Sequence, residues 1–164
     1  SSSWTIMVKW KSNKVHWHNA DSEPTTLEHI IDVIKSNDLY EIHVGCDSHK
    51  RGQTYIFAIV IAGYVQRRGG TFYFHRKRSK DSSLSSIPFR LMKEAELALE
   101  IAHKLQERFP EKNINVHLDL NPDKRFASSK VLTNAVSWVN SFGYNAIVKP
   151  NSWASSGLAD AFAK

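Results

Sequence analysis

The sequence predicts a single α/β domain with a mixed five-stranded sheet and helices on both faces. A continuous apolar run over residues 55–62 is typical of a central strand that is buried on both faces. Residues 41–48 and 114–120 alternate apolar and polar side chains, as half-buried strands do. Residues 88–109 carry an apolar stripe at spacings of three and four, which predicts a long helix.

The composition suits one soluble, intracellular domain that spans residues 1–164. Hydrophobic residues make up 41% of the chain and charged residues 23%, as in ordinary globular proteins. A single cysteine, Cys46, cannot form an internal disulfide, and no apolar run approaches the ~20 residues that a membrane span requires. We therefore expect a cytoplasmic protein with no membrane partner.

Residues 1–40 are predicted to form an N-terminal arm and a helix. Thr25 and Glu28 form a capping box, and an apolar stripe follows it to about Ser36, which predicts a helix that docks on the sheet. Tryptophans in such an arm more often cover the core than stack on bases. The arm contains Trp4, Trp10 and Trp17.

From residue 41 to residue 164 the predicted order is strand, strand, strand, helix, strand, helix, strand, helix. Turn-like segments at residues 49–52 and 67–70 make the first three strands an antiparallel meander, which ends over residues 71–75. The serine-rich segment 79–86 predicts a polar loop near any substrate. The remaining elements are a helix over residues 128–142, a strand over residues 144–148 and a helix that ends with the chain.

An aspartate lies near the end of two predicted strands. Asp47 ends the first strand on the face that carries His43 and Gly45, and Asp119 has the same place beside His117. If the two strands are parallel neighbours, both carboxylates come within reach of one divalent cation such as Mg²⁺, which takes oxygen ligands. The alternative for Asp47 is an aspartate that begins a turn.

Two further acidic residues fall on predicted helices. Glu94 lies on the flank of the buried stripe of the long helix, while Glu96 lies on a more solvated face. The alternative for Glu94 is an ion pair with Arg90 across one turn. Asp160 lies among small residues near the end of the chain, where a helix could approach the sheet closely; in isolation it would be an exposed helix residue.

The order of elements and the placement of these four acids resemble the ribonuclease H-like fold. More narrowly, blocks of sequence within roughly residues 25 to 164 are similar to the YkuK-type family of bacterial and phage proteins. One departure is Cys46, where a small residue such as threonine is expected; it faces away from Asp47. The similar blocks are Val44 to Ser48, Arg90 to Leu97, His117 to Asn121, and Lys149 to Ser155 with Ala159 and Asp160.

This resemblance implies a metal-dependent nuclease that hydrolyses phosphodiester bonds. Two Mg²⁺ or Mn²⁺ ions would be bound by Asp47 and Asp119 with help from Glu94 and Asp160, and these four acids would be the catalytic residues. The expected products are a 5′-phosphate and a 3′-hydroxyl. The alternative is a non-catalytic nucleic-acid-binding or assembly module on the same fold.

The charge balance favours a polyanionic partner. The chain has 22 Lys and Arg against 16 Asp and Glu, a net charge of +6, and ordinary solubilising charge is the alternative explanation. The cations cluster, and we expect those of the predicted hairpin to crowd one edge of the fold and to bind RNA, an RNA–DNA hybrid or structured DNA. The predicted nucleic-acid-binding residues are Arg67, Arg68, Arg76, Lys77, Arg78 and Lys149.

Other kinds of site find little support in the sequence. His16 and His18 are the only close histidine pair, and with one cysteine they leave no compact tetrahedral zinc set. No glycine cluster fits a nucleotide-binding loop, and no serine hydrolase elbow is present.

Overall fold

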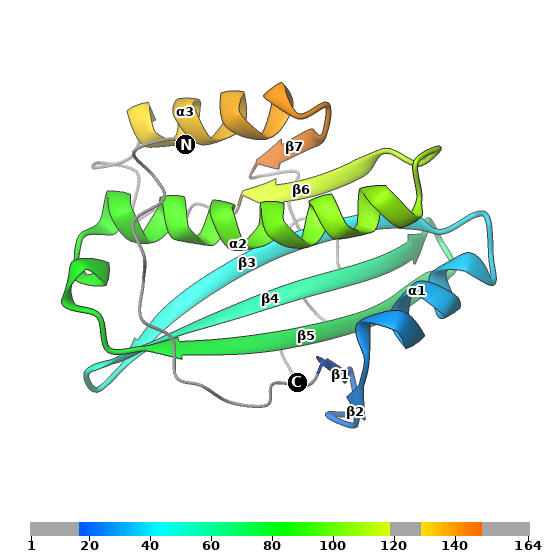
Figure 1. Ribbon diagram of the computed structural model, residues 1–164, viewed down its shortest axis with the longest axis horizontal. Coiled ribbons are helices and arrows are strands. Elements are labelled where there is room, and N and C mark those ends of the chain that lie inside the picture. The colour runs from blue at the N-terminus through cyan, green and yellow to red at the C-terminus, as the bar shows by residue number, and fades with distance from the viewer. Residues whose placement is uncertain (1–16, 119–128, 149–164) are drawn as a thin grey trace.

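The computed structural model describes residues 17–118 and 129–148 (Figure 1). Within these residues the chain forms strands, three α-helices and one 3-10 helix, η1. In chain order they are β1 (Trp17–Asn19), β2 (Pro24–Thr25), α1 (Leu27–Lys35), β3 (Glu41–Arg51), β4 (Thr54–Val65), β5 (Gly69–Ser79), η1 (Ser82–Ser85), α2 (Ile87–Arg108), β6 (Ile114–Leu118), α3 (Ser129–Ser141) and β7 (Asn145–Val148).

The strands form one mixed sheet in the order β2-β1-β5-β4-β3-β6-β7. As predicted, β3, β4 and β5 make an antiparallel meander, and β6 pairs with β3 in parallel. The five predicted strands are present, and two short strands, β1 and β2, extend the sheet to seven in the described part of the chain. β1 supplies backbone partners to part of β5, and β2 pairs with the outer side of β1.

The described helices lie on one face of the sheet (Figure 1). Ile42 and Val44 of β3 are fully buried in a core that includes residues of α1, α2 and α3. Helices were predicted on both faces, and the last predicted helix lies outside the described residues. The face with Ile42 and Val44 is therefore the helix-covered face, and the opposite face carries His43 and Asp47 because strand side chains alternate.

The predicted turn at residues 49–52 is too long. β3 continues to Arg51, which pairs with Thr54, and the turn is confined to Gly52 and Gln53. Gly52 has φ +63°, a left-handed conformation that glycine adopts without steric cost. The strand is longer than predicted because the apolar run of β4 pairs with it along its whole length.

Two helix starts differ in detail from the prediction. The N-cap of α1 is Thr26, whose hydroxyl accepts a hydrogen bond from the His29 amide at 3.1 Å, because Thr25 is extended in β2. In the serine-rich segment predicted as a loop, Asp81 caps η1, and Leu84 is fully buried. A polar segment with one apolar side chain can be anchored to the core in this way.

The long helix α2 matches its prediction closely. Ser86 is its N-cap, and Pro88 lies in the first turn, where its missing N–H costs nothing. The predicted stripe is buried: Leu91, Ala95, Ala98, Ala102, Leu105 and Phe109 are at most 5% exposed. None of the described helices is long and apolar enough to cross a membrane.

The buried side chain of His75 on β5 should make the protein less stable to unfolding in acid. Its ring nitrogens are buried without a hydrogen-bond partner beneath the Trp17 ring, whose centroid lies 5.0 Å away. Burial, followed by the charges of Lys77, Lys104 and His18, lowers the pKa of His75 to about 4. Because the unfolded chain binds this proton near pH 6.5, stability should be full above that pH and should fall as the pH drops towards about 4.

We expect the loss attributable to His75 to be roughly 2 to 3 kcal/mol. It is measured by urea unfolding of the wild type and of His75→Phe between about pH 7 and about pH 4. The difference between the two proteins isolates His75 from other buried histidines. Equal pH dependence in both would show that His75 is not buried as the neutral form.

Candidate functional site

Asp47 lies just beyond the last paired residues of the two central parallel strands. Gly45 pairs with His117, and Asp47 follows Gly45 by two positions just as Asp119 follows His117. The parallel pairing on which the predicted carboxylate pair depends is therefore present. Asp119 itself lies outside the described residues, as do Asp160 and Lys149.

Glu94 of α2 points at Ser48 of β3. Its side chain is 6% exposed, and its Oε2 accepts a hydrogen bond from the Ser48 hydroxyl. The backbone N–H of Ser48 donates to Oδ1 of Asp47 at 2.9 Å. Ser48 thus holds both carboxylates, one through its hydroxyl and one through its amide.

Asp47 and Glu94 approach Ser48 from different sides of the sheet. Cys46 and Ser48 face α2, so strand alternation places the exposed side chain of Asp47 on the opposite face. Because Asp47 and Glu94 lie on opposite faces, their carboxylates could approach each other only past the last paired residues of β3 and β6. That Ser48 donates hydrogen bonds to both acids was not predicted from the sequence. The only indication in the sequence is its position directly after Asp47.

The structure separates the two helix glutamates. Glu96 forms an ion pair with Lys93 at 2.7 Å, and the Lys93 side chain is 6% exposed. Glu94 instead faces the sheet, as the stripe predicted. Glu94 is therefore placed as a candidate ligand, and Glu96 as a structural partner of a buried lysine.

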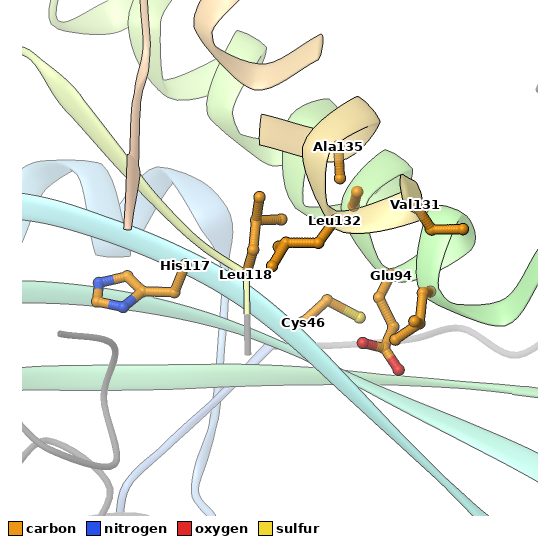
Figure 2. Close-up of a pocket in the computed structure, with 9 residues that line it drawn as sticks. Cys46, Glu94, His117, Leu118, Val131, Leu132 and Ala135 are labelled. Carbon is orange, nitrogen blue, oxygen red and sulfur yellow. The ribbon is translucent and has the colours of Figure 1, made fainter. Parts of the chain in front are cut away.

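A small, mostly apolar cavity adjoins Glu94 between α2, α3 and the sheet (Figure 2). The Cys46 sulfur points towards the Glu94 side chain, and the His117 ring points away from it. The apolar side chains that line the cavity partly shield the carboxylate of Glu94 from water. The lining residues are Cys46, Leu91, Glu94, Ala95, His117, Leu118, Val131, Leu132 and Ala135.

His43 and His117 form a buried pair on the face opposite α2. His43 Nδ1 lies 2.9 Å from His117 Nε2, and His43 Nε2 lies 3.2 Å from a Glu41 carboxylate oxygen. Burial lowers the pKa of His43 and lowers the pKa of His117 to about 3, so both rings are neutral at pH 7. They link β3 to β6 just before the two aspartates.

The predicted cations of the hairpin lie on β5 and in the turn that precedes it, at opposite ends of that strand. Arg67 and Arg68 lie in the β4–β5 turn, whereas Arg76 lies roughly 25 Å further along β5 at about 3.4 Å per residue. Arg76 is in register with Ala58, which is in register with Asp47. Arg76 therefore shares a face with Asp47 two strands away, about 10 Å between backbones.

The neighbours of Arg76 on β5 divide between the two faces. Arg78 shares the Asp47 face, and Lys77 alternates onto the helix-covered face. The Arg76 guanidinium packs over the Phe74 ring at 4.4 Å, which directs it along the sheet. Of the predicted cations in the described residues, Arg76 and Arg78 share the sheet face of Asp47.

The described donors suit a hard divalent cation. Asp47 and Glu94 supply carboxylate oxygens, which are the ligands of Mg²⁺ and Mn²⁺. Within residues 17–118 and 129–148, no three His, Cys, Asp or Glu side chains gather as a complete metal site. A complete site would need the acids that the sequence places on the segments beyond these residues.

The fold is a mixed α/β sheet in which an acidic residue follows the paired part of two parallel strands. A helix that covers the sheet adds a second acid. These features define a class of α/β proteins with acidic residues near strand ends. The ribonuclease H-like family model matches residues 25–164, and the chain belongs to this family. No curated protein and no solved structure matches the chain.

Proposed function

We propose that the protein is a divalent-metal-dependent nuclease that hydrolyses phosphodiester bonds of nucleic acid. The observation that carries the proposal is the junction at Ser48, whose amide donates to Asp47 and whose hydroxyl donates to Glu94, just beyond the last paired residues of β3 and β6. Membership of the ribonuclease H-like family supports a nucleic-acid substrate. The remaining ligands proposed from the sequence are Asp119 and Asp160.

The residues of the site have separate tasks in this proposal. Bound Mg²⁺ or Mn²⁺ ions would activate a water and stabilise the leaving oxygen. Asp47 is exposed, and its carboxylate would bind the ions that in turn contact the substrate phosphate. Glu94 is buried, and the hydrogen bond from Ser48 fixes its orientation, so it acts as a preorganised ligand.

The direct test is a cleavage assay on a panel of labelled nucleic acids: single-stranded RNA, an RNA–DNA hybrid, duplex DNA and a DNA junction. We expect at least one to be cleaved with Mg²⁺ or Mn²⁺ and none in EDTA. Products with 5′-phosphate and 3′-hydroxyl ends would show that the bond between phosphorus and the 3′ oxygen is the one cleaved. Binding without cleavage of any substrate would instead establish a non-catalytic nucleic-acid-binding module.

Arg76 and Arg78 should contact substrate phosphates on the Asp47 face. Replacing both with glutamine should lower the slope of log affinity against log salt by roughly 1.4 on a single strand. Arg67→Gln with Arg68→Gln is the matched control, because it removes the same charge from the other end of the β4–β5 hairpin. Equal losses in the two double variants would assign the effect to net charge alone.

A further inference from the structure

A pair of cations on the helix-covered face stands one helical turn from Glu94. Lys50 lies on β3 two positions after Ser48, and Arg90 lies on α2 four positions before Glu94. Both therefore continue the rows that carry the Ser48–Glu94 hydrogen bond. None of the site residues predicted from the sequence belongs to this pair.

Both cations are held against one aromatic ring. The Lys50 ammonium lies 5.5 Å from the centre of the Tyr55 ring, and the Arg90 guanidinium lies 5.4 Å from it. Tyr55 of β4 is 4% exposed and is paired in register with Lys50 of β3. The negative face of an aromatic ring attracts cations, and this attraction helps to hold both side chains at Tyr55.

No direct ion pair neutralises the two cations in the described part of the chain, although Glu94 follows Arg90 by one helical turn. The neighbouring Lys93, by contrast, is paired with Glu96. The Nε–H of Arg90 is also buried without a hydrogen-bond partner. An unsatisfied buried donor costs about 1 to 3 kcal/mol, so an anion that draws the Arg90 side chain outward would relieve this cost.

We propose that Lys50 and Arg90, positioned by Tyr55, bind a phosphate of a nucleic-acid strand next to the one held at Asp47 and Glu94. The ligand follows from the proposed function, because a nuclease substrate presents further phosphates beside the cleaved one. The planar guanidinium of Arg90 and the exposed ammonium of Lys50 are the two donor types that proteins use for phosphate. The subsite holds the strand on the helix-covered face, whereas Arg76 and Arg78 act on the other.

The experiment measures binding without cleavage, using a fluorescent single-stranded oligonucleotide in EDTA over a range of salt. We expect Lys50→Gln with Arg90→Gln to lower the salt slope by roughly 1.4, and Lys50→Gln alone by roughly 0.7. Lys50 is exposed, so the single variant tests the subsite even if the Arg90 change disturbs the fold.

The matched control is Lys35→Gln with Arg108→Gln. Lys35 also lies over an aromatic ring, Phe109, and Arg108 is on α2, roughly 27 Å from Arg90 at about 1.5 Å per residue. This control should leave the slope unchanged. An unchanged slope in the Lys50 and Arg90 variants, or an equal loss in the control, overturns the subsite.

Two further measurements separate this inference from the proposed function. Adenosine monophosphate should bind far more weakly than the oligonucleotide, and equal affinity would overturn the assignment to a strand phosphate. Cleavage by the wild type tests the nuclease proposal independently of the salt slope. A wild type that binds but does not cleave would leave the phosphate subsite standing and refute the nuclease, and one that binds no nucleic acid would refute both.

Discussion

Asp47→Asn is expected to lower the cleavage rate by orders of magnitude while the fold stays intact. The substitution keeps the shape of the side chain but removes the charge that would hold a divalent cation just beyond the last pair of β3 and β6. A ligand of this kind supplies several kcal/mol of transition-state stabilisation, so a loss on the order of 10³-fold follows. The measurement is the initial cleavage rate with Mg²⁺ or Mn²⁺, and wild-type rates would refute the two-metal proposal.

The same variant has a defined effect on stability. Asparagine can still accept the hydrogen bond that Ser48 N–H donates to Asp47 Oδ1, so the melting temperature in chelator should hold or rise. Asp47→Ala removes that acceptor and should cost about 1 kcal/mol. If Asp47→Asn melts as early as Asp47→Ala, the carboxylate charge itself is structural and the aspartate has a role other than metal binding.

Glu94→Gln should lose cleavage and metal affinity but keep its stability, whereas Glu96→Gln should lose stability but keep cleavage and metal affinity. Glutamine at position 94 keeps an oxygen for the Ser48 hydroxyl but loses the carboxylate, so cleavage should be abolished and the fold kept. Changes to the partners of metal ligands already cost 10-fold to 100-fold in affinity, so we expect at least a roughly tenfold loss of metal affinity here. Calorimetric titration with Mn²⁺ and the cleavage assay measure the two effects.

Glu96→Gln serves as the matched control on the same helix. It removes the partner of Lys93, whose side chain is 6% exposed, and leaves a buried cation unpaired. We expect a loss of roughly 1 to 3 kcal/mol in urea unfolding, with metal affinity and cleavage retained. A pattern in which Glu96→Gln loses activity and Glu94→Gln does not would reverse the assignment of the helix ligand.

Much of the fold follows from local patterns in the sequence. The stripe from Leu91 to Phe109 predicted α2 and its buried face, since side chains three and four apart share one side of any helix. The same stripe singled out Glu94 over Glu96 as the sheet-facing acid. Alternation in residues 41–48 likewise placed Asp47 on the face opposite Cys46. These conclusions need only the fixed periods of helix and strand.

The tertiary structure decided which of these faces meet. Ser48 and Glu94 are 46 residues apart, and their hydrogen bond depends on where α2 lies along β3. The grouping of Lys50, Tyr55 and Arg90 depends on the same docking together with the β3–β4 register. Local spacing determines the direction of a side chain on its own element, but packing between distant segments sets the relative position of two elements. The sequence by itself therefore determined five of the strands, the long helix and the acids they carry, and only the packed sheet and helix linked Asp47 and Glu94 to Ser48.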